Sequence, residues 1–193
     1  MRKVLTLSIM LVLAAGCSSP RTGDLLFVYD DAGEFSEAVR QSTDGGYSHV
    51  GFYEKGRGVW EASPGKAVVC TPLCEFSAEN EGRVKAYRPS VRIDRKKLID
   101  RALQLSGRPY DLAFEPGDSA LYCSEFVQEC YASAGLEFES IEMNFCSEDG
   151  EVLPYWRAWY DSLGRAVPQG KPGTNPNDLS RSPLLRPVTY RPR

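Results

Sequence analysis

The order of two short motifs constrains this 193-residue chain more than any other feature. Residues 47–52 (YSHVGF) have the composition of a strand and carry the only histidine, His49. Residues 122–127 (YCSEFV) follow much later and place Cys123 at the expected start of a helix. A thiol nucleophile needs a base that accepts its proton near neutral pH, and imidazole suits that task. If the chain is a cysteine hydrolase, His49 is therefore its base.

Taken singly, both residues also allow a structural interpretation. His49 lies in an apolar strand, and a buried cysteine often serves as a small hydrophobic residue. The position of Cys123 favours chemistry, because unpaired N–H groups and the helix dipole stabilise a thiolate at a helix N-terminus. A cysteine at a helix start that faces a histidine on a sheet is suited to acyl transfer.

Glu61 is the best candidate for the group that orients the imidazole, because it lies on the next expected strand, 59–63. Opposed residues of an antiparallel hairpin share a face, and each one-residue slip reverses that face. His49 and Glu61 share a face only if opposed residue numbers sum to an even value. That register predicts an odd loop, such as three residues within 55–58. The alternative is that Glu61 is a solvated strand residue.

The sequence offers further site candidates beside these three. Tyr110 is expected to donate its hydroxyl to a developing oxyanion next to the Cys123 backbone N–H, or else to be a packing aromatic. Glu125 is a weaker candidate, because acids in a first turn favour helix N-termini in any case. The residues taken as candidates for substrate binding are Ser48, Ser124, Glu125 and Trp60.

The N-terminus has the pattern of an export signal. Arg2 and Lys3 precede an apolar run, 4–15, that is too short to span a bilayer stably. Residues 13–17 (LAAGC) resemble a bacterial lipoprotein cleavage box, which predicts a signal peptide over 1–16 and acylation of Cys17. A plain secretory signal is the alternative. We expect a protein of the bacterial cell envelope, exported to the periplasm or held at a membrane by its lipid.

Composition bounds the remainder. Removing residues 1–16 takes away two cations, so 21 Lys and Arg face 26 Asp and Glu, a net charge of about −5. This balance argues against nucleic acid as a partner. About 177 residues suit a single domain over 17–193, and we expect a monomer.

Cysteine usage permits several arrangements. Five cysteines remain beside Cys17, and outside the cytoplasm an even number could pair and leave one reactive thiol. With one histidine and no second close cysteine pair, neither a metal nor another cofactor is expected. The disulfide pattern stays open for Cys70, Cys74, Cys130 and Cys146.

The expected elements alternate between strands and helices. Strands are predicted at 25–29, 47–54, 59–63, 68–69 and 84–87, and helices at 34–42, 94–106, 122–134 and 153–163. Asp94 fits an N-cap, and Gly107 fits the position after the same helix. The aromatic residues of 153–163 are expected in the core and its rim rather than at a ligand site. The Pro-rich segment 164–193 is expected to pack on a core of 22–163, with a disordered tail as the alternative.

Five motifs in one order resemble the NlpC/P60 superfamily in its circularly permuted YiiX/YaeF-like branch. They are residues 23–27 (GDLLF), 48–51 (SHVG), 60–62 (WEA), 107–111 (GRPYD) and 122–125 (YCSE), and residues 170–179 also resemble the tail of that branch. The resemblance covers about residues 22–190. It implies a papain-like α+β fold whose antiparallel sheet packs against the cysteine helix. It also implies a triad of Cys123, His49 and Glu61, with Tyr110 near the oxyanion.

The resulting hypothesis is an exported cysteine amidase or peptidase. The resemblance implies peptide or amide substrates derived from the cell wall, including ones with a free amino group. The main alternative is an acyl-lipid hydrolase or acyltransferase that uses the same thiol, and the third is a non-catalytic binding module. A long apolar groove would favour acyl-lipid chemistry, whereas an acidic pocket would favour the peptidase.

Overall fold

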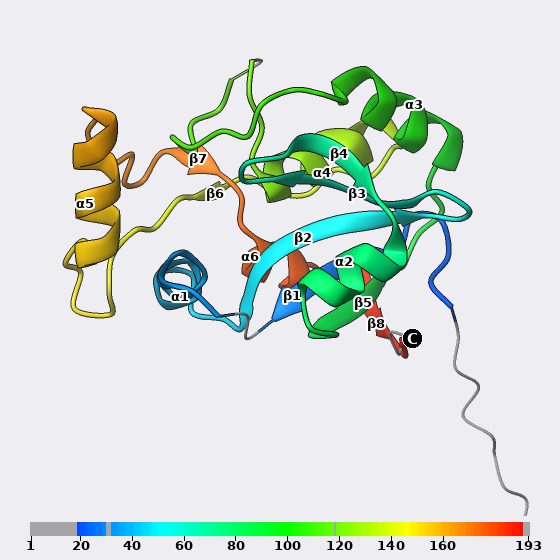
Figure 1. Ribbon diagram of the computed structural model, residues 1–193, viewed down its shortest axis with the longest axis horizontal. Coiled ribbons are helices and arrows are strands. Elements are labelled where there is room, and N and C mark those ends of the chain that lie inside the picture. Colours follow the sequence, from blue (N-terminus) through cyan, green and yellow to red (C-terminus); the bar gives the residue numbers. More distant parts are fainter. Residues whose placement is uncertain (1–18, 30–31, 118, 191–193) are drawn as a thin grey trace, which may run out of the picture.

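A six-stranded antiparallel sheet in the order β4-β3-β2-β1-β5-β8 forms the centre of the computed structural model (Figure 1). The structure describes residues 19–29, 32–117 and 119–190. The strands are β1 (Leu25–Tyr29), β2 (Tyr47–Glu54), β3 (Gly58–Ser63), β4 (Ala67–Thr71), β5 (Val84–Pro89) and β8 (Leu185–Val188), while β6 (Ile141–Glu142) pairs with β7 (Pro172–Gly173) in a second, small sheet.

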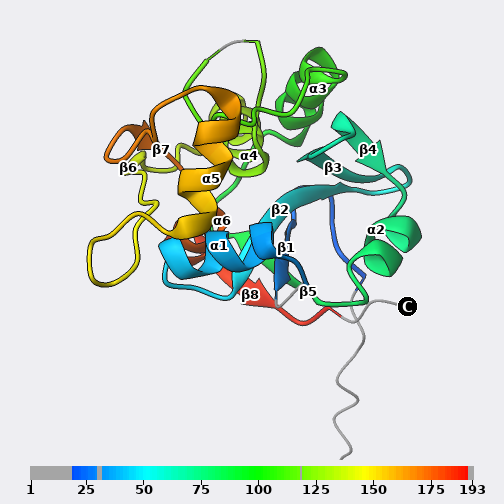
Figure 2. The same cartoon turned by 60° about the vertical axis from the view of Figure 1, so that its left-hand side comes forward.

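Helices cover both faces of the large sheet, which confirms the expected α+β class. They are α1 (Glu34–Ser42), α2 (Leu73–Glu79), α3 (Arg95–Leu105), α4 (Cys123–Ser133), α5 (Pro154–Leu163) and α6 (Pro176–Arg181). Alternate residues of β1 belong to different clusters: Leu25 and Phe27 pack with α3 and α4, and Leu26 and Val28 pack with Phe76 of α2. Figure 2 shows α5 against α1 at the far side of the molecule from α2.

The β2–β3 hairpin has the register that the Glu61 hypothesis requires. Phe52 pairs with Trp60 and Glu54 with Gly58, so opposed residue numbers sum to an even value across a three-residue loop. Gly56 in that loop has φ +84°, a conformation in which glycine carries no steric penalty. The predicted parity is confirmed.

Gly51 allows the hairpin to close tightly beside the histidine. A Cβ at this position would lie 2.6 Å from the Trp60 carbonyl oxygen and 3.2 Å from the Glu61 Cβ. Any side chain would therefore push β3 away from β2. The close approach leaves Glu61 diagonal to His49, within reach of a long side chain.

The helix predicted at 94–106 is confirmed as α3, with the cap and the glycine that the sequence indicated. The Asp94 side chain accepts from the Lys96 and Lys97 N–H groups and caps α3, and Gly107 follows the helix with φ +83°. The segment after α3 is tied to the sheet, because the Gly107 N–H donates to the Val68 carbonyl at 2.9 Å.

A short parallel bridge then brings the tyrosine motif to the cysteine. Tyr110 pairs with Leu121, and the Leu121 N–H donates to the Pro109 carbonyl at 3.0 Å. Cys123 lies two residues beyond that bridge, so backbone pairing alone makes motifs 107–111 and 122–125 neighbours.

The C-terminal segment supplies β7, α6 and β8, and β8 extends the large sheet by pairing with β5. No helix within the described residues is long and apolar enough to cross a membrane. The expected signal peptide and Cys17 lie outside the described residues, so their assignments stay predictions.

Candidate active site

Cys123 is the first residue of α4 and is 5% exposed. The helix start is held by the Tyr122 backbone N–H, which donates to the Glu125 carboxylate at 3.4 Å. Glu125 thus has the capping role that its position predicted. Because the first-turn N–H groups of α4 surround Cys123, negative charge on its sulfur is favoured there.

His49 lies between Glu61 and Cys123. Its Nε2 is 2.7 Å from Glu61 Oε2, and the Cys123 side chain is near enough to help raise the pKa of the imidazole. Because Nε2 is used by the carboxylate, Nδ1 is the ring nitrogen left for the sulfur. The contact between His49 and Glu61 that the hairpin parity predicted is confirmed.

Thr71 of β4 is a further member that the sequence did not reveal. Its hydroxyl donates to Glu61 Oε1 at 2.5 Å, so both carboxylate oxygens have a partner. Glu61 is 3% exposed, and a buried carboxylate needs such partners. The spacing between Glu61 and Thr71 becomes meaningful only once the β3–β4 register, with Glu61 opposite Val69, is known.

The three side chains favour charged forms of the histidine and the acid. Burial alone would lower the pKa of His49, but hydrogen bonds to Cys123 and Glu61 outweigh it and raise the pKa to about 10. Burial alone would raise the pKa of Glu61, yet the contact with His49 and the Thr71 hydroxyl bring it below its usual value. A protonated imidazole beside the sulfur is the arrangement that supports a reactive thiolate.

Tyr110 reaches the same sulfur from the other motif. It lines the same pocket as Cys123, and its hydroxyl is held protonated, because burial and then the charges of Cys123 and Asp111 raise the pKa of Tyr110 well above its usual value. The structure therefore brings Cys123, His49, Glu61 and Tyr110 together.

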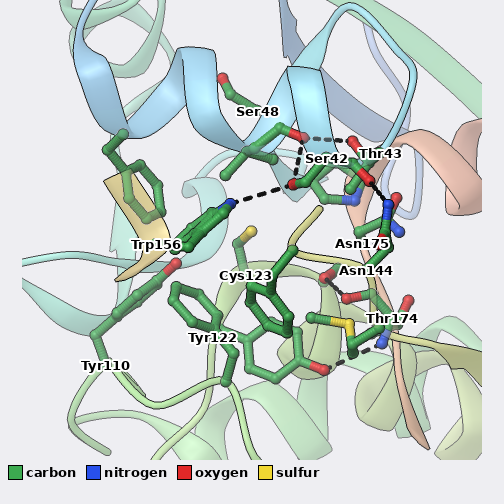
Figure 3. A pocket seen from close by; sticks show the side chains of 17 residues that line it. Ser42, Thr43, Ser48, Tyr110, Tyr122, Cys123, Asn144, Trp156, Thr174 and Asn175 are labelled. Atoms are coloured by element: carbon green, nitrogen blue, oxygen red, sulfur yellow. Dashed lines mark hydrogen bonds between the residues drawn. The ribbon is translucent and has the colours of Figure 1, made fainter. Parts of the chain in front are cut away.

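A pocket with a cavity volume of about 40 Å³ lies beside Cys123 (Figure 3), and neither His49 nor Glu61 is among its lining residues. Within the described part of the chain its lining includes no Asp, Glu, Lys or Arg. The apolar lining comes from six separate segments and comprises Phe35, Val39, Phe114, Tyr122, Met143, Phe145, Trp156 and Pro176. Trp156 of α5 is 2% exposed and belongs to the core, as expected for the aromatic residues of this segment, and it also lines the pocket.

Several polar groups at this pocket form hydrogen bonds with protein partners. The Trp156 indole N–H donates to Ser42 Oγ at 3.4 Å, and Asn144 donates to the Ser42 carbonyl at 2.8 Å. Ser124 Oγ donates to the Thr174 carbonyl at 3.1 Å. These bonds turn polar atoms toward each other, so the space beside Cys123 is bounded mainly by hydrocarbon and aromatic rings.

The four residues suggested for substrate binding lie in different places, and only two of them line the pocket. Ser48 and Ser124 line the pocket. Glu125 caps α4, and burial followed by the nearby Asp111 charge raises its pKa to about 8. Trp60 lies in the core with its indole N–H bonded to Glu54 at 2.7 Å, away from the pocket lining.

The other four cysteines within the described residues are free thiols. Cys74 is exposed, Cys70 is half-buried, and Cys130 and Cys146 are buried. Burial raises the pKa of Cys130 well above its usual value, which makes it a poor nucleophile. Cys130 therefore fits the core role that its spacing from Cys123 suggested.

Comparison with known proteins agrees with this geometry. The family model described as the permuted papain-like amidase enzyme, YaeF/YiiX, matches residues 19–189. The chain belongs to this family. It is 32% identical over 139 residues to YiiX of Escherichia coli strain K12, covering 68% of this chain and 67% of the relative. As a member of the YaeF/YiiX amidases, the chain is a cysteine hydrolase with a permuted papain-like fold.

A solved structure supports the same fold. The crystal structure titled metalloprotein yiiX from Escherichia coli O157:H7 superposes with a TM-score of 0.76 at 26% identity, covering 89% of this chain and 98% of that one. The described residues of our chain contain no cluster of three or more His, Cys, Asp or Glu side chains able to hold a metal ion.

Proposed function

We propose that Cys123, His49 and Glu61 form the catalytic triad of this amidase. The Cys123 sulfur, its proton transferred to His49, attacks the amide carbonyl carbon. The C–N bond then breaks as His49 gives that proton to the leaving nitrogen, which yields a thioester and a free amine. Water attacks the thioester, His49 takes a water proton and returns it to the departing sulfur, and a carboxylic acid is released.

Tyr110 is assigned to the oxygen of the tetrahedral intermediate. Its hydroxyl stays protonated, and Tyr110 lines the pocket together with Cys123, where the substrate carbonyl must lie during attack. Together with the Cys123 backbone N–H it supplies two donors toward the developing negative charge. Donors fixed in advance are worth more there than the same groups in water.

The substrate is proposed to carry an apolar acyl group on the carbonyl side of the scissile bond. The uncharged, aromatic lining beside Cys123 is the observation that supports this choice. A peptide with a free amine, the first expectation from sequence, needs a carboxylate in the pocket, and the described lining has none. An acyl ester or thioester fits the same pocket, so acyl-lipid hydrolysis or acyl transfer is the second candidate.

A substrate panel tests the proposed function. We expect N-acyl amides with aliphatic or aromatic acyl groups to be hydrolysed faster than muropeptides, with products identified by mass spectrometry. Acyl esters and acyl lipids form a third arm that measures the second candidate. Turnover of muropeptides alone would contradict the apolar-acyl assignment.

Thiol alkylation tests the triad without a known substrate. We expect iodoacetamide to label Cys123 faster than the exposed Cys74 at pH 6–7, because only Cys123 has an imidazolium partner. Cys74 is a control within the same molecule. Equal rates for the two thiols, or faster labelling of Cys74, would contradict the proposed ion pair.

Export and lipidation are proposed from residues 1–17 alone. We expect metabolic labelling with a fatty acid to mark the full chain at Cys17 and to be lost in Cys17→Ser. Labelling that persists in the variant, or a mature protein cut elsewhere, would favour a plain secretory signal.

A further inference from the structure

The strand that carries His49 is weakly supported just where the histidine lies. On one side, Val28 pairs with His49 but Tyr29 pairs with Tyr47, so Ser48 forms a bulge against β1. On the other side, the β2–β3 ladder covers only Phe52 to Glu54. The start of β2 therefore needs another neighbour to fix its backbone.

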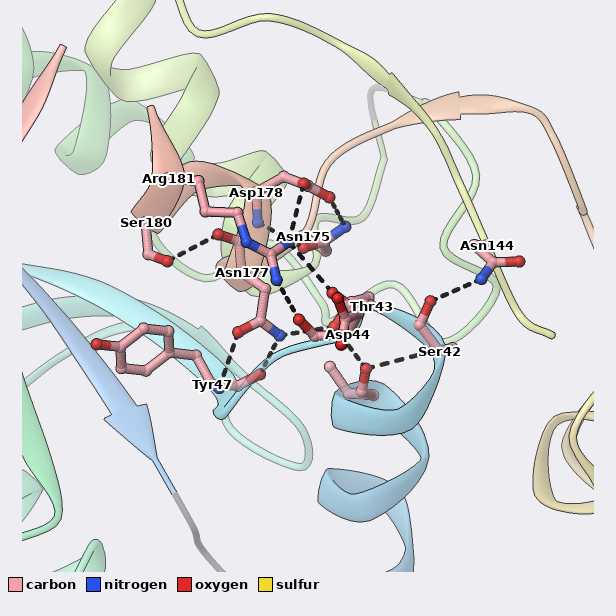
Figure 4. Close-up of polar contacts among 11 residues, drawn as sticks. Ser42, Thr43, Asp44, Tyr47, Asn144, Asn175, Asn177, Asp178, Ser180 and Arg181 are labelled. Carbon is pink, nitrogen blue, oxygen red and sulfur yellow. Dashed lines mark hydrogen bonds and ion pairs between the residues drawn. The ribbon is translucent and has the colours of Figure 1, made fainter. Parts of the chain in front are cut away.

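Asn177 of α6 is that neighbour. Its Oδ1 accepts from the Tyr47 N–H at 2.9 Å, and its Nδ2 donates to the Tyr47 carbonyl at 2.8 Å (Figure 4). One side chain thus makes the pair of bonds that an adjoining strand would make. Tyr47 lies two residues before His49.

The same amide also secures the loop that enters the strand. Asn177 Nδ2 donates to Thr43 Oγ1 at 2.6 Å, and the residue is 1% exposed. A Cβ at Gly45 would lie 2.1 Å from Asn177 Oδ1, so only glycine fits at position 45 beside this side chain. Arg181 adds a bond from the same helix to the Asp44 carbonyl.

Helix α6 is itself held firmly. Asn175 caps it by accepting from the Asp178 N–H at 2.9 Å, and Ser180 Oγ donates to the Asn177 carbonyl at 2.7 Å. The residues just before Asn177, from Thr174 to Pro176, line the apolar pocket. One short segment therefore touches both the pocket and the strand of the proposed base.

We infer that Asn177 is a positioning residue for the reaction, which acts on His49 through the backbone of Tyr47. This inference rests on the proposed triad. Without the amide, the bulged strand start has lost its second neighbour, and the imidazole moves away from Cys123. The side-chain bonds of Asn177 go to Tyr47 and Thr43, so the helix that begins at Cys123 and the Glu61 hairpin are expected to stay in place.

The test is the pH dependence of Cys123 alkylation together with steady-state kinetics. In Asn177→Ala we expect Cys123 labelling at pH 6–7 to fall roughly 10- to 100-fold, the scale of a misplaced catalytic group, and kcat to fall in parallel. KM for an apolar N-acyl amide should change little. A purely structural role would lower the melting temperature and leave the alkylation profile of the folded protein unchanged.

Arg181→Ala is the matched control, since it removes contacts from the same helix to the same loop but none to Tyr47. It should keep the wild-type profile. If Asn177→Ala does not fold, Asn177→Asp serves, because it keeps the volume and the acceptor for the Tyr47 N–H but loses the donor to the Tyr47 carbonyl. A wild-type profile in either folded Asn177 variant overturns the inference.

The two proposals fail in different ways. If the pH profile of Cys123 alkylation is the same in wild type and in His49→Ala, the triad itself is wrong. If wild type shows enhanced labelling at pH 6–7 that His49→Ala loses and Asn177→Ala retains, only the positioning role is wrong.

Discussion

The two sides of Cys123 are built in different ways. On the polar side, His49, Glu61 and Thr71 come from three consecutive strands within 23 residues, counted from 49 to 71. On the apolar side, the pocket is assembled mainly from α1, residues 110–114, residues 122–124, residues 143–145, α5 and residues 174–176. The polar side is therefore built from neighbouring strands, with Asn177 supporting the start of β2 beside His49. The more dispersed side is the one that we propose selects the acyl group.

The largest expected effect is on the polar side. His49→Ala should reduce kcat by roughly 10²- to 10⁴-fold, because the imidazole acts in both half-reactions. Binding of an apolar carboxylic acid product, measured by calorimetry, should be nearly unchanged, because the pocket lining does not include His49. Loss of product binding together with turnover would show that the two sides are not independent.

The next effect is on the apolar side. Val39 lines the pocket from α1, and Val39→Trp should fill part of it. We expect kcat/KM for long-chain N-acyl amides to fall roughly 10- to 100-fold while short acyl groups are affected less, since a single methylene is worth about 1–3 kcal/mol in such sites. Val39→Ala is the control and should not lose long-chain substrates. An equal loss for all chain lengths would contradict the assignment of this pocket to the acyl group.

The same division explains how much could be predicted from sequence. The hairpin parity, the Asp94 cap and the helix start at Cys123 follow from local rules on loops, caps and alternation, and the structure confirms them. Local rules also located His49 and Glu61 on one face. Their catalytic roles rest on the proposal above.

What the sequence did not reveal depends on contacts between distant segments. Helix α2 has seven residues and begins after Pro72 without a side-chain cap, so it has little local signal. Thr71, Asn177 and Trp156 are ordinary residues until the fold places them beside Glu61, Tyr47 and the pocket. No periodicity identifies such residues.

A smaller effect is expected from Glu61→Gln, where an amide can still hold the imidazole but cannot neutralise it. The carboxylate helps to raise the pKa of His49 to about 10, so its removal should lower that pKa. Activity that depends on the imidazolium should then decline on the alkaline side at a lower pH in the variant than in wild type. At neutral pH, kcat should fall roughly tenfold. The pH–rate profiles of wild type and variant decide this, and coincident alkaline limbs would contradict the role of Glu61.

The free energy of unfolding should also depend on pH through the raised pKa of His49. Because the pKa of His49 in the folded protein exceeds its unfolded value of about 6.5, its contribution is full below that value and is lost as pH rises through about 10. Glu61→Gln should therefore lose part of the stability that wild type has near neutral pH. Urea unfolding at pH 7 and pH 10 measures the difference, which should be larger at pH 7.

The smallest expected effect comes from Thr71→Val, which keeps the shape of the side chain and removes the donor to Glu61 Oε1. His49 still holds Oε2, so kcat at pH 7 should change by only about two- to fivefold, which corresponds to roughly 0.4–1 kcal/mol. The free energy of unfolding should fall by about 1–3 kcal/mol, because a buried charged acceptor loses one bond.

The Thr71 hydroxyl also helps to lower the pKa of Glu61 in the folded protein. A lowered pKa gives stability that is present above the pKa of the unfolded chain and is lost as pH falls through the pKa of the folded protein. The deficit of Thr71→Val should therefore be largest at neutral pH and shrink below about pH 4. Thr71→Ser keeps the hydroxyl and should retain the wild-type acid limb. If Thr71→Val lowered kcat as much as His49→Ala does, the hydroxyl would belong to the reacting centre itself, and the polar side would have four members where three are proposed.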